Sequence, residues 1–222
     1  MKFKLSALSV AVSIACSTSA FAELDQVSVI GSQEAANATA GAATYIGEQE
    51  LERFEYTDIN RILNSVSGVY LREEDGYGLR PNIGIRGSGT ERSGKITLME
   101  DGILIAPAPY ASPSAYYFPT AARMQAIEVI KGPGAVKYGP RTTGGAINMV
   151  SRQIPEGDQA VVDIAAGSDN ARKAHIYGGT STDRVGAVVE VLRQETDGFK
   201  ELDNGGDTGF NKNDYLAKLR PH

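Results

Sequence analysis

The spacing of apolar residues changes along the chain and divides it into four segments. An apolar run follows a short basic start within residues 1–22, and a stretch rich in small and polar residues follows within residues 23–43. Residues 44–155 combine one helical pattern with several short apolar runs, and residues 156–222 alternate apolar with polar positions. We therefore expect a leader, a flexible region, a small α+β domain and an antiparallel sheet, in that order.

The α+β domain is predicted to contain a small mixed sheet and short helices. One helix is expected over residues 48–54, and a second begins after Thr57 as its N-cap and ends before Gly68. The second helix buries one face, because its apolar residues follow the i, i+3, i+4, i+7 spacing: Ile59, Ile62, Leu63 and Val66. Short strands are expected at 69–71, 83–87, 96–99, 103–105 and 126–131, a polar loop at 73–82 and a Pro- and Tyr-rich loop at 106–119.

Residues 156–222 have the period of two that is typical of a sheet with one apolar face. The apolar members of this pattern are Ala160, Val162, Ile164, Ala166, Ala174, Ile176, Val185, Ala187, Val189, Val191, Tyr215, Ala217 and Leu219. Strands of about ten residues joined by short turns indicate a membrane β-barrel, although a soluble antiparallel sheet shows the same alternation. A barrel needs at least about eight strands, so we expect these to be the first antiparallel strands of a truncated transmembrane β-barrel.

The first 22 residues predict export. Two lysines precede the apolar run, which covers residues 5–15, and Ala20-Phe21-Ala22 offers a cleavage site of small residues. This order is that of a secretory signal peptide, and the run is too short to span a bilayer. A lipoprotein signal with Cys16 as the acylated residue is the alternative, but Ser13 occupies a position where such signals carry a branched aliphatic residue.

Composition argues against several classes of function. The net charge of −5 becomes −7 once the leader, with its two lysines and no acid, is removed, so nothing attracts the chain to nucleic acid. The single cysteine lies in the leader and the two histidines are His175 and His222, so we expect no disulfide, no metal site and no cofactor. One internal histidine does not suffice to assemble a nucleophile–base pair, and we predict no catalytic residue and no enzyme.

One isolated strand pattern lies between the leader and the α+β domain. Residues 24–30 alternate and are prone to form a strand, whereas residues 31–43 are mostly small or polar and are expected to form a flexible tether. A strand on such a tether has no partner in its own domain. It is therefore either an ordinary edge strand or a strand that pairs with another protein.

An ordered set of short motifs lies between residues 83 and 152. In chain order they are Ile85-Arg86-Gly87, Leu98-Met99-Glu100-Asp101-Gly102, Ile127-Glu128-Val129-Ile130-Lys131-Gly132-Pro133-Gly134, Tyr138-Gly139, Gly144-Gly145-Ala146-Ile147-Asn148 and Val150-Ser151-Arg152. In this order they resemble the plug domain of TonB-dependent outer-membrane receptors. The resemblance covers the whole chain, because the strand pattern at 25–30 resembles the TonB box of that family and the alternating tail resembles its first barrel strands.

This resemblance implies an organisation and a set of partners. It predicts a signal peptide at 1–22, a TonB box and tether at 23–43, a plug at 44–155 and barrel strands at 156–222. The plug would fill a barrel of about 22 strands that contacts lipid in the outer membrane of a Gram-negative bacterium, with the N-terminus in the periplasm. TonB would pair with the box as an added strand and pull on it; the box residues are Asp25, Gln26, Val27, Ser28, Val29 and Ile30.

Two further sets of side chains acquire roles from the resemblance. Ion pairs between plug and barrel wall are expected at Arg86, Glu100, Glu128, Arg141 and Arg152, with solvated surface charge as the alternative. Four residues on the outward loops 76–82 and 106–119 are expected to meet the ligand: Arg80, Tyr110, Tyr116 and Tyr117. A guanidinium and phenols suit an anionic chelate, although the tyrosines could equally pack on the barrel wall.

The function expected from these features is import of an iron chelate, a siderophore or ferric citrate, into the periplasm. The loop at 106–119 resembles most closely the receptors of the ferric citrate group. The alternatives are a receptor of the same family for a non-iron ligand and a soluble periplasmic binding or adaptor module. A periplasmic hydrolase is the least supported alternative.

Overall fold

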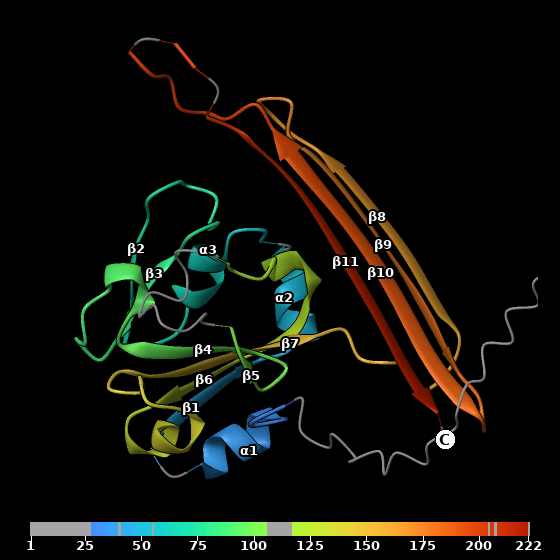
Figure 1. Cartoon of the computed structure of the whole chain (residues 1–222), viewed down its shortest axis with the longest axis horizontal. Coiled ribbons are helices and arrows are strands. Elements are labelled where there is room, and N and C mark those ends of the chain that lie inside the picture. The colour runs from blue at the N-terminus through green and yellow to red at the C-terminus, as the bar shows by residue number, and fades with distance from the viewer. Residues whose placement is uncertain are drawn as a thin grey trace, which may run out of the picture.

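The computed structural model describes residues 28–39, 41–54, 56–105, 117–203, 205–206 and 208–221. The predicted signal peptide at 1–22 lies outside them, as does most of the predicted loop at 106–119. The described residues form two bodies side by side, a mixed α+β domain and a long antiparallel sheet (Figure 1). No helix in these ranges is both long enough and apolar enough to cross a membrane.

A five-stranded sheet in the order β1-β6-β7-β4-β5 forms the centre of the α+β domain. Its strands are β1 (Ala42–Ile46), β4 (Ile96–Glu100), β5 (Ile103–Leu104), β6 (Met124–Lys131) and β7 (Gly145–Ser151). β4 and β7 are parallel and all other neighbours are antiparallel, so the sheet is mixed, as the sequence predicts. Nearly every residue of β6 and β7 is buried, because both faces of the sheet are covered.

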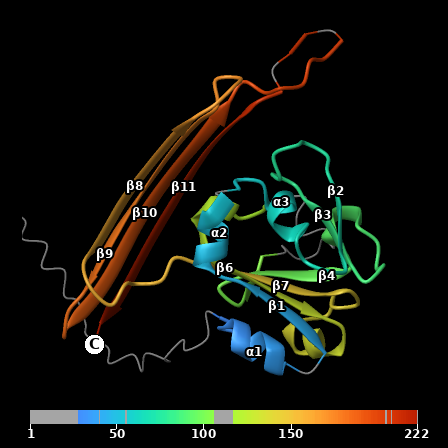
Figure 2. The ribbon, with the colours of Figure 1, turned by 180° about the vertical axis from the view of Figure 1, so that it is seen from behind.

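Helices and a hairpin cover the two faces of this sheet (Figure 1, Figure 2). On one face lie α2 (Glu48–Phe54), α3 (Ile59–Leu63) and the hairpin of β2 (Val69–Arg72) and β3 (Asn82–Ile85). On the other lie α1 (Gln33–Ala38) and the 3-10 helix η4 (Pro133–Tyr138); two further 3-10 turns are η1 (Glu91–Ser93) and η3 (Ala121–Arg123). The main core includes Ile59, Leu63, Ile83, Ile85, Ile127 and Ile147, each at most 1% exposed.

Helix α3 has the predicted buried face but different ends. Ile59, Ile62, Leu63 and Val66 are all buried. The N-cap is Asp58, whose Oδ1 accepts the N–H of Asn60 at 2.8 Å, and the prediction of Thr57 is wrong. The helix ends at Leu63, before the residue predicted to stop it, and the backbone then continues in tighter turns, in which the N–H of Ser65 donates to Ile62 O at 3.3 Å and the N–H of Val66 to Leu63 O at 3.0 Å. Gly68 lies beyond, in the turn to β2, with φ +80.

The prediction of a flexible tether over residues 31–43 is wrong for most of its length. Residues 33–38 form α1, with Ser32 Oγ accepting the N–H of Ala35 at 3.1 Å as N-cap and Ala36 buried. Ala42 and Ala43 already pair with β6. Alanine has the highest helix propensity, and so an alanine-rich segment can form a helix and pack on a core that other residues supply. The α+β domain therefore begins before the predicted boundary at residue 44.

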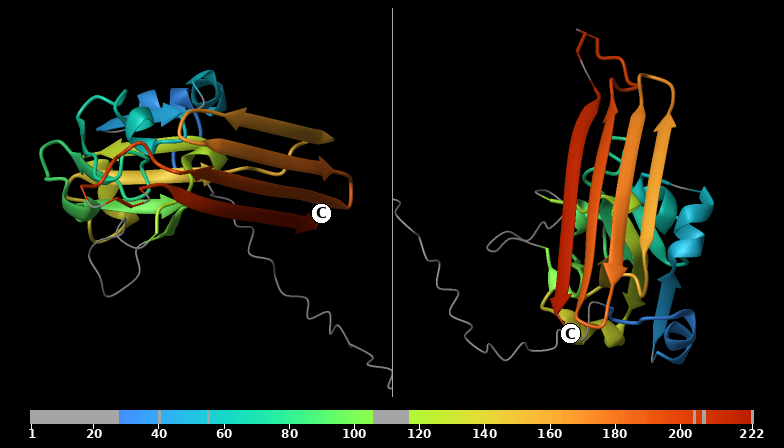
Figure 3. Two further views of the ribbon diagram at one scale, coloured as in Figure 1. Left: turned by 90° about the horizontal axis from the view of Figure 1, so that it is seen from above. Right: turned by 90° about the vertical axis from the view of Figure 1, so that its right-hand side faces the viewer.

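The antiparallel sheet has the order β11-β10-β9-β8 and one apolar outer face. Its strands are β8 (Gln159–Ala166), β9 (Arg172–Ser181), β10 (Val185–Thr196) and β11 (Phe210–Pro221). The predicted alternation is confirmed, because seven of its apolar residues are at least 40% exposed: Val162, Ile164, Ile176, Val189, Val191, Tyr215 and Leu219. Figure 3 shows the four strands standing against one side of the α+β domain.

Candidate functional site

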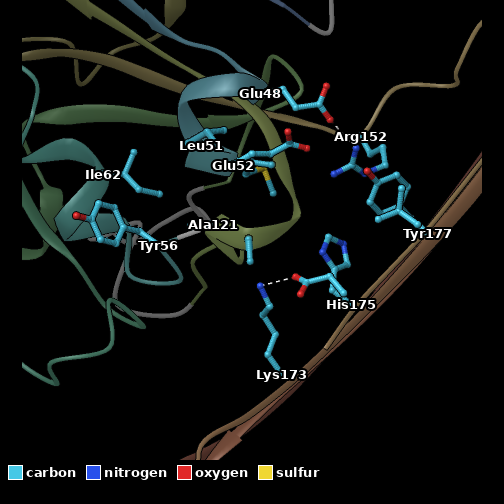
Figure 4. Close-up of a pocket in the computed structure, with 14 residues that line it drawn as sticks. Glu48, Leu51, Glu52, Tyr56, Ile62, Ala121, Arg152, Lys173, His175 and Tyr177 are labelled. Carbon is cyan, nitrogen blue, oxygen red and sulfur yellow. Dashed lines mark hydrogen bonds and ion pairs between the residues drawn. The ribbon is translucent and has the colours of Figure 1, made fainter. Parts of the chain in front are cut away.

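Arg152 lies at the junction between the α+β domain and the antiparallel sheet. Its Nη1 donates to Glu48 Oε1 of α2 at 2.9 Å, and its Nε donates to Glu190 Oε1 of β10 at 3.1 Å. Its guanidinium also lies 3.5 Å from the ring centroid of Tyr177 on β9 (Figure 4). Burial lowers the pKa of Arg152, but the hydrogen bonds to Glu48 and Glu190 more than reverse this, and the pKa is raised overall. Because Glu190 is fully buried, this is a buried ion pair between the two bodies.

A pocket of about 210 Å³ lies beside Arg152, lined by residues of α2, β8 and β9 (Figure 4). His175 Nε2 lies 2.8 Å from Glu190 Oε1, and Lys173 Nζ lies 2.5 Å from Asp163 Oδ2. His175 and Lys173 therefore each already have a carboxylate partner. Among the residues that the structure describes, no cluster of three or more His, Cys, Asp or Glu side chains could hold a metal ion. The pocket lies between the two bodies, and its lining combines charged side chains with apolar ones such as Leu51 and Ile62.

A second buried ion pair joins the two bodies at Arg123, which the sequence analysis missed. Arg123 is 3% exposed, pairs with Glu100 of β4, and has its Nε 3.3 Å from Asp214 Oδ2 of β11. Burial lowers the pKa of Arg123, but the negative charge of Glu100 outweighs this and the pKa is raised. Asp214 occupies a polar position in the period-two pattern of its strand, and that position is the signal by which a plug-facing carboxylate could have been predicted.

The side chains predicted to pair with a barrel wall occupy different environments. Arg152 and Glu100 lie at the two buried junctions with the antiparallel sheet. Arg86 and Arg141 are exposed, and neither forms an ion pair within the described part of the chain. Glu128 is fully buried, and its carboxylate bonds to residues 28–31 and to Asn148.

Only the end of the predicted TonB box, residues 28–30, is described, and Asp25, Gln26 and Val27 lie outside the described residues. Residues 28–30 form no strand, so the predicted strand is wrong for this part. Their N–H and hydroxyl groups instead bond to Glu128 and hold the backbone in a bend.

Of the four predicted ligand residues, Arg80 and Tyr117 lie within the described part of the chain. Tyr110 and Tyr116 lie outside the described residues. Arg80 is exposed between β2 and β3, and its side chain forms no ion pair with any described residue, although its N–H donates to Asp75 Oδ2 at 3.0 Å. The Tyr117 hydroxyl donates to Glu100 Oε2 at 3.1 Å, and burial together with the charge of Glu100 raises the pKa of Tyr117 to about 12. The guanidinium of Arg80 is therefore available to bind a ligand, whereas the hydroxyl of Tyr117 already donates its hydrogen bond to Glu100.

Comparison with known proteins identifies this arrangement. The family model described as TonB-dependent Receptor Plug Domain matches residues 35–146. The chain belongs to the TonB-dependent receptors. The predicted fold is therefore confirmed: the α+β domain is a plug, and the antiparallel strands that follow it correspond to the start of a barrel that the four strands do not close.

Three relatives show how far the likeness extends. The vitamin B12 transporter BtuB of Vibrio vulnificus is 28% identical over 183 residues, which cover 79% of this chain and 29% of that protein. The ferric yersiniabactin uptake receptor FyuA from Yersinia pestis matches with a TM-score of 0.66 at 22% identity, over 84% of this chain and 29% of the other. The ferric citrate transporter FecA in its unliganded form matches with a TM-score of 0.54 at 24% identity, over 75% of this chain and 30% of the other. The chain thus spans less than a third of the length of these relatives.

The plug and the barrel strands of this receptor also meet through aromatic side chains. Tyr77, in the plug loop that contains Arg80, has its ring centroid 5.3 Å from that of Phe199 and 5.0 Å from that of Phe210. Its hydroxyl accepts the N–H of Phe199 at 3.1 Å. The loop between β2 and β3 is therefore attached to the loop between β10 and β11, and Arg80 is close in sequence to this attachment.

Proposed function

We propose that the chain is the N-terminal part of a TonB-dependent receptor in the outer membrane, which imports an iron chelate into the periplasm. The observation that carries the proposal is the buried pair of Arg152 on the plug and Glu190 on β10. This pair fixes the plug against the polar face of a sheet whose opposite face is apolar. A sheet with one polar, plug-facing side and one apolar side suits the wall of a barrel in lipid.

The energy for import would arrive as a mechanical pull. The outer membrane has no nucleotide supply of its own, so the work has to pass through a contact with a partner driven from the inner membrane. The box at residues 25–30 would supply that contact by pairing with TonB as an added strand, which uses backbone hydrogen bonds and tolerates many side chains. The predicted signal peptide places this segment in the periplasm.

The ligand we favour is an anionic iron chelate, such as ferric citrate or a siderophore. Arg80 presents an exposed guanidinium on the plug loop attached to Phe199, and a guanidinium binds carboxylates in a bidentate geometry. Tyr110 and Tyr116, which belong to the predicted loop at 106–119, would add hydroxyl donors. The similarity to the vitamin B12 transporter favours a second candidate, a corrinoid, whose amide-rich surface depends less on a cation.

Direct titration separates the two candidates. We expect the purified full-length receptor to bind ferric citrate or a ferric siderophore saturably in isothermal titration calorimetry, and cyanocobalamin not to bind. Binding of cyanocobalamin with no response to any ferric chelate would contradict the proposed ligand and leave the receptor family unchanged.

Replacing Arg80 and Tyr116 together by alanine should weaken binding of the ferric chelate at least about tenfold, or roughly 1.4 kcal/mol. The double change removes a cation and a phenol donor from the proposed site. Arg92→Ala is the matched control, because Arg92 is also an exposed plug arginine but pairs with Glu74. An unchanged Kd in the correctly inserted double variant would assign recognition to other loops of the receptor.

A further inference from the structure

Glu128 carries a buried carboxylate without a cationic partner among the described residues. It lies near the middle of β6, and its side chain is fully buried. A buried charge is unfavourable unless hydrogen bonds or an opposite charge compensate it. Here the compensation comes from hydrogen bonds, and most of the donors belong to residues 28–31, the N-terminal segment.

Both carboxylate oxygens of Glu128 accept hydrogen bonds from the N-terminal segment. Oε1 accepts the N–H groups of Ile30 at 2.9 Å and Gly31 at 2.7 Å. Oε1 also accepts the Ser28 hydroxyl, and Oε2 accepts the N–H of Val29 at 2.7 Å. Gly31 has φ +86, a left-handed conformation that glycine adopts without strain and that helps successive N–H groups to converge on one anion. Hydrogen bonds to an ionised carboxylate are stronger than those between neutral groups.

Two further contacts hold this arrangement in place. From the neighbouring strand β7, Asn148 Nδ2 donates to Glu128 Oε2 at 2.8 Å. Val29 and Ile30 pack against the apolar cluster that includes Ile130, on the same strand as Glu128. The N-terminal segment is thus attached to the interior of the five-stranded sheet without being a strand of it.

We propose that Glu128 holds the N-terminal segment on the plug of the resting receptor and thereby sets how readily TonB can bind it. This inference rests on the proposed function, in which TonB pairs with residues 25–30. Strand pairing at Val29 and Ile30 would use backbone N–H groups that already bond to Glu128. Pairing with TonB and attachment to Glu128 therefore compete, and Glu128 is a positioning residue for the coupling segment.

The position of Glu128 also determines where a pulling force first acts on the plug. A force applied to residues before Ser28 reaches the bonds to Glu128 before it reaches α1 or β1. Through Glu128 the force passes to β6, which pairs with both β1 and β7. Because one side chain accepts all of these bonds, a single substitution should detach the whole N-terminal segment.

Glu128→Gln tests this attachment, because glutamine keeps the size of the side chain but has one acceptor oxygen and an amide group that opposes the N–H donors. In the full-length receptor without ligand, we expect a nitroxide label at Gln26→Cys to become more mobile in electron paramagnetic resonance spectra. In the unlabelled protein, the Kd for the purified periplasmic domain of TonB should fall about tenfold, which is roughly 1.4 kcal/mol.

Gly31→Pro is a second variant that leaves the sheet untouched. It removes one N–H donor and the left-handed conformation, so it should shift both readouts in the same direction. Asp101→Asn is the matched control, because Asp101 is a plug carboxylate that accepts the N–H of Ser151 at 2.8 Å, whereas the N–H groups of Val29, Ile30 and Gly31 bond to Glu128. It should leave label mobility and the Kd for TonB unchanged.

The outcomes separate this inference from the proposed function. Equal label mobility and equal Kd in the unmodified receptor, Glu128→Gln and Gly31→Pro would overturn the role of Glu128. If Glu128→Gln does not fold, Gly31→Pro decides alone. If no variant binds TonB, the proposed function is contradicted, while label mobility still shows whether Glu128 holds the segment.

Discussion

Replacing Arg152 with methionine is expected to lower the free energy of unfolding of the full-length receptor by about 3–5 kcal/mol, the range for breaking a buried ion pair from one side. Methionine preserves much of the side-chain volume but leaves the fully buried Glu190 without its guanidinium partner. The contact over the ring of Tyr177 is lost as well. Urea denaturation of the receptor in detergent, followed by circular dichroism, measures the change in the free energy of unfolding.

Two variants show whether the loss comes from the buried charge. Glu190→Gln combined with Arg152→Met should recover a large part of the lost stability, because the double variant contains no buried unpaired charge at this site, and Glu48, the other partner of Arg152, is partly exposed to solvent. Arg193→Met, on the same strand as Glu190, should barely change the denaturation midpoint, since Arg193 and Glu195 form an exposed ion pair. A midpoint that Arg152→Met leaves unchanged would show that this pair does not hold the plug to the barrel strands.

Val27→Pro in the full-length receptor is expected to abolish uptake while leaving the Kd for the ligand unchanged. Pairing of the box with TonB as an added strand needs the backbone N–H and an extended backbone at this position. Proline removes the N–H and fixes φ. Val27 lies outside the described residues, next to the segment that Glu128 holds. Uptake of a radiolabelled ferric chelate by cells, compared with binding to purified receptor, separates coupling from recognition.

Val27→Thr is the control for this substitution, because threonine keeps the N–H and the β-branched shape and should support normal uptake. If Val27→Pro imports the chelate at the normal rate, the coupling contact lies elsewhere in the chain. If it loses ligand binding as well, the substitution has damaged more than the box.

Local spacing was sufficient to predict most of the fold. The i, i+3, i+4, i+7 pattern around Ile59 follows the face that the helix buries, and the period of two after residue 156 follows the two alternating faces of a strand, so both patterns are found in the structure. The N-cap was misplaced by one residue, to Thr57 instead of Asp58, because both types cap helices and the sequence does not show which side chain reaches the second N–H.

The pairing of side chains between distant segments could not be predicted in the same way. Period-two spacing places Glu190 and Asp214 on the polar face of their strands, but which plug arginine meets each depends on how the two bodies dock. Glu128 was expected to meet a barrel cation, since no local signal shows that residues about a hundred positions earlier return to it. The small residues at 33–38 were misinterpreted because composition alone does not reveal a core supplied by other segments.

TonB-driven import is tested by uptake of a radiolabelled ferric chelate by cells that carry the full-length receptor and no other receptor for that chelate. We expect accumulation of the label when TonB is present and none above background when TonB is absent, with the receptor in the outer membrane in both strains. Equal accumulation with and without TonB, or no accumulation of any chelate that the purified receptor binds, would contradict it.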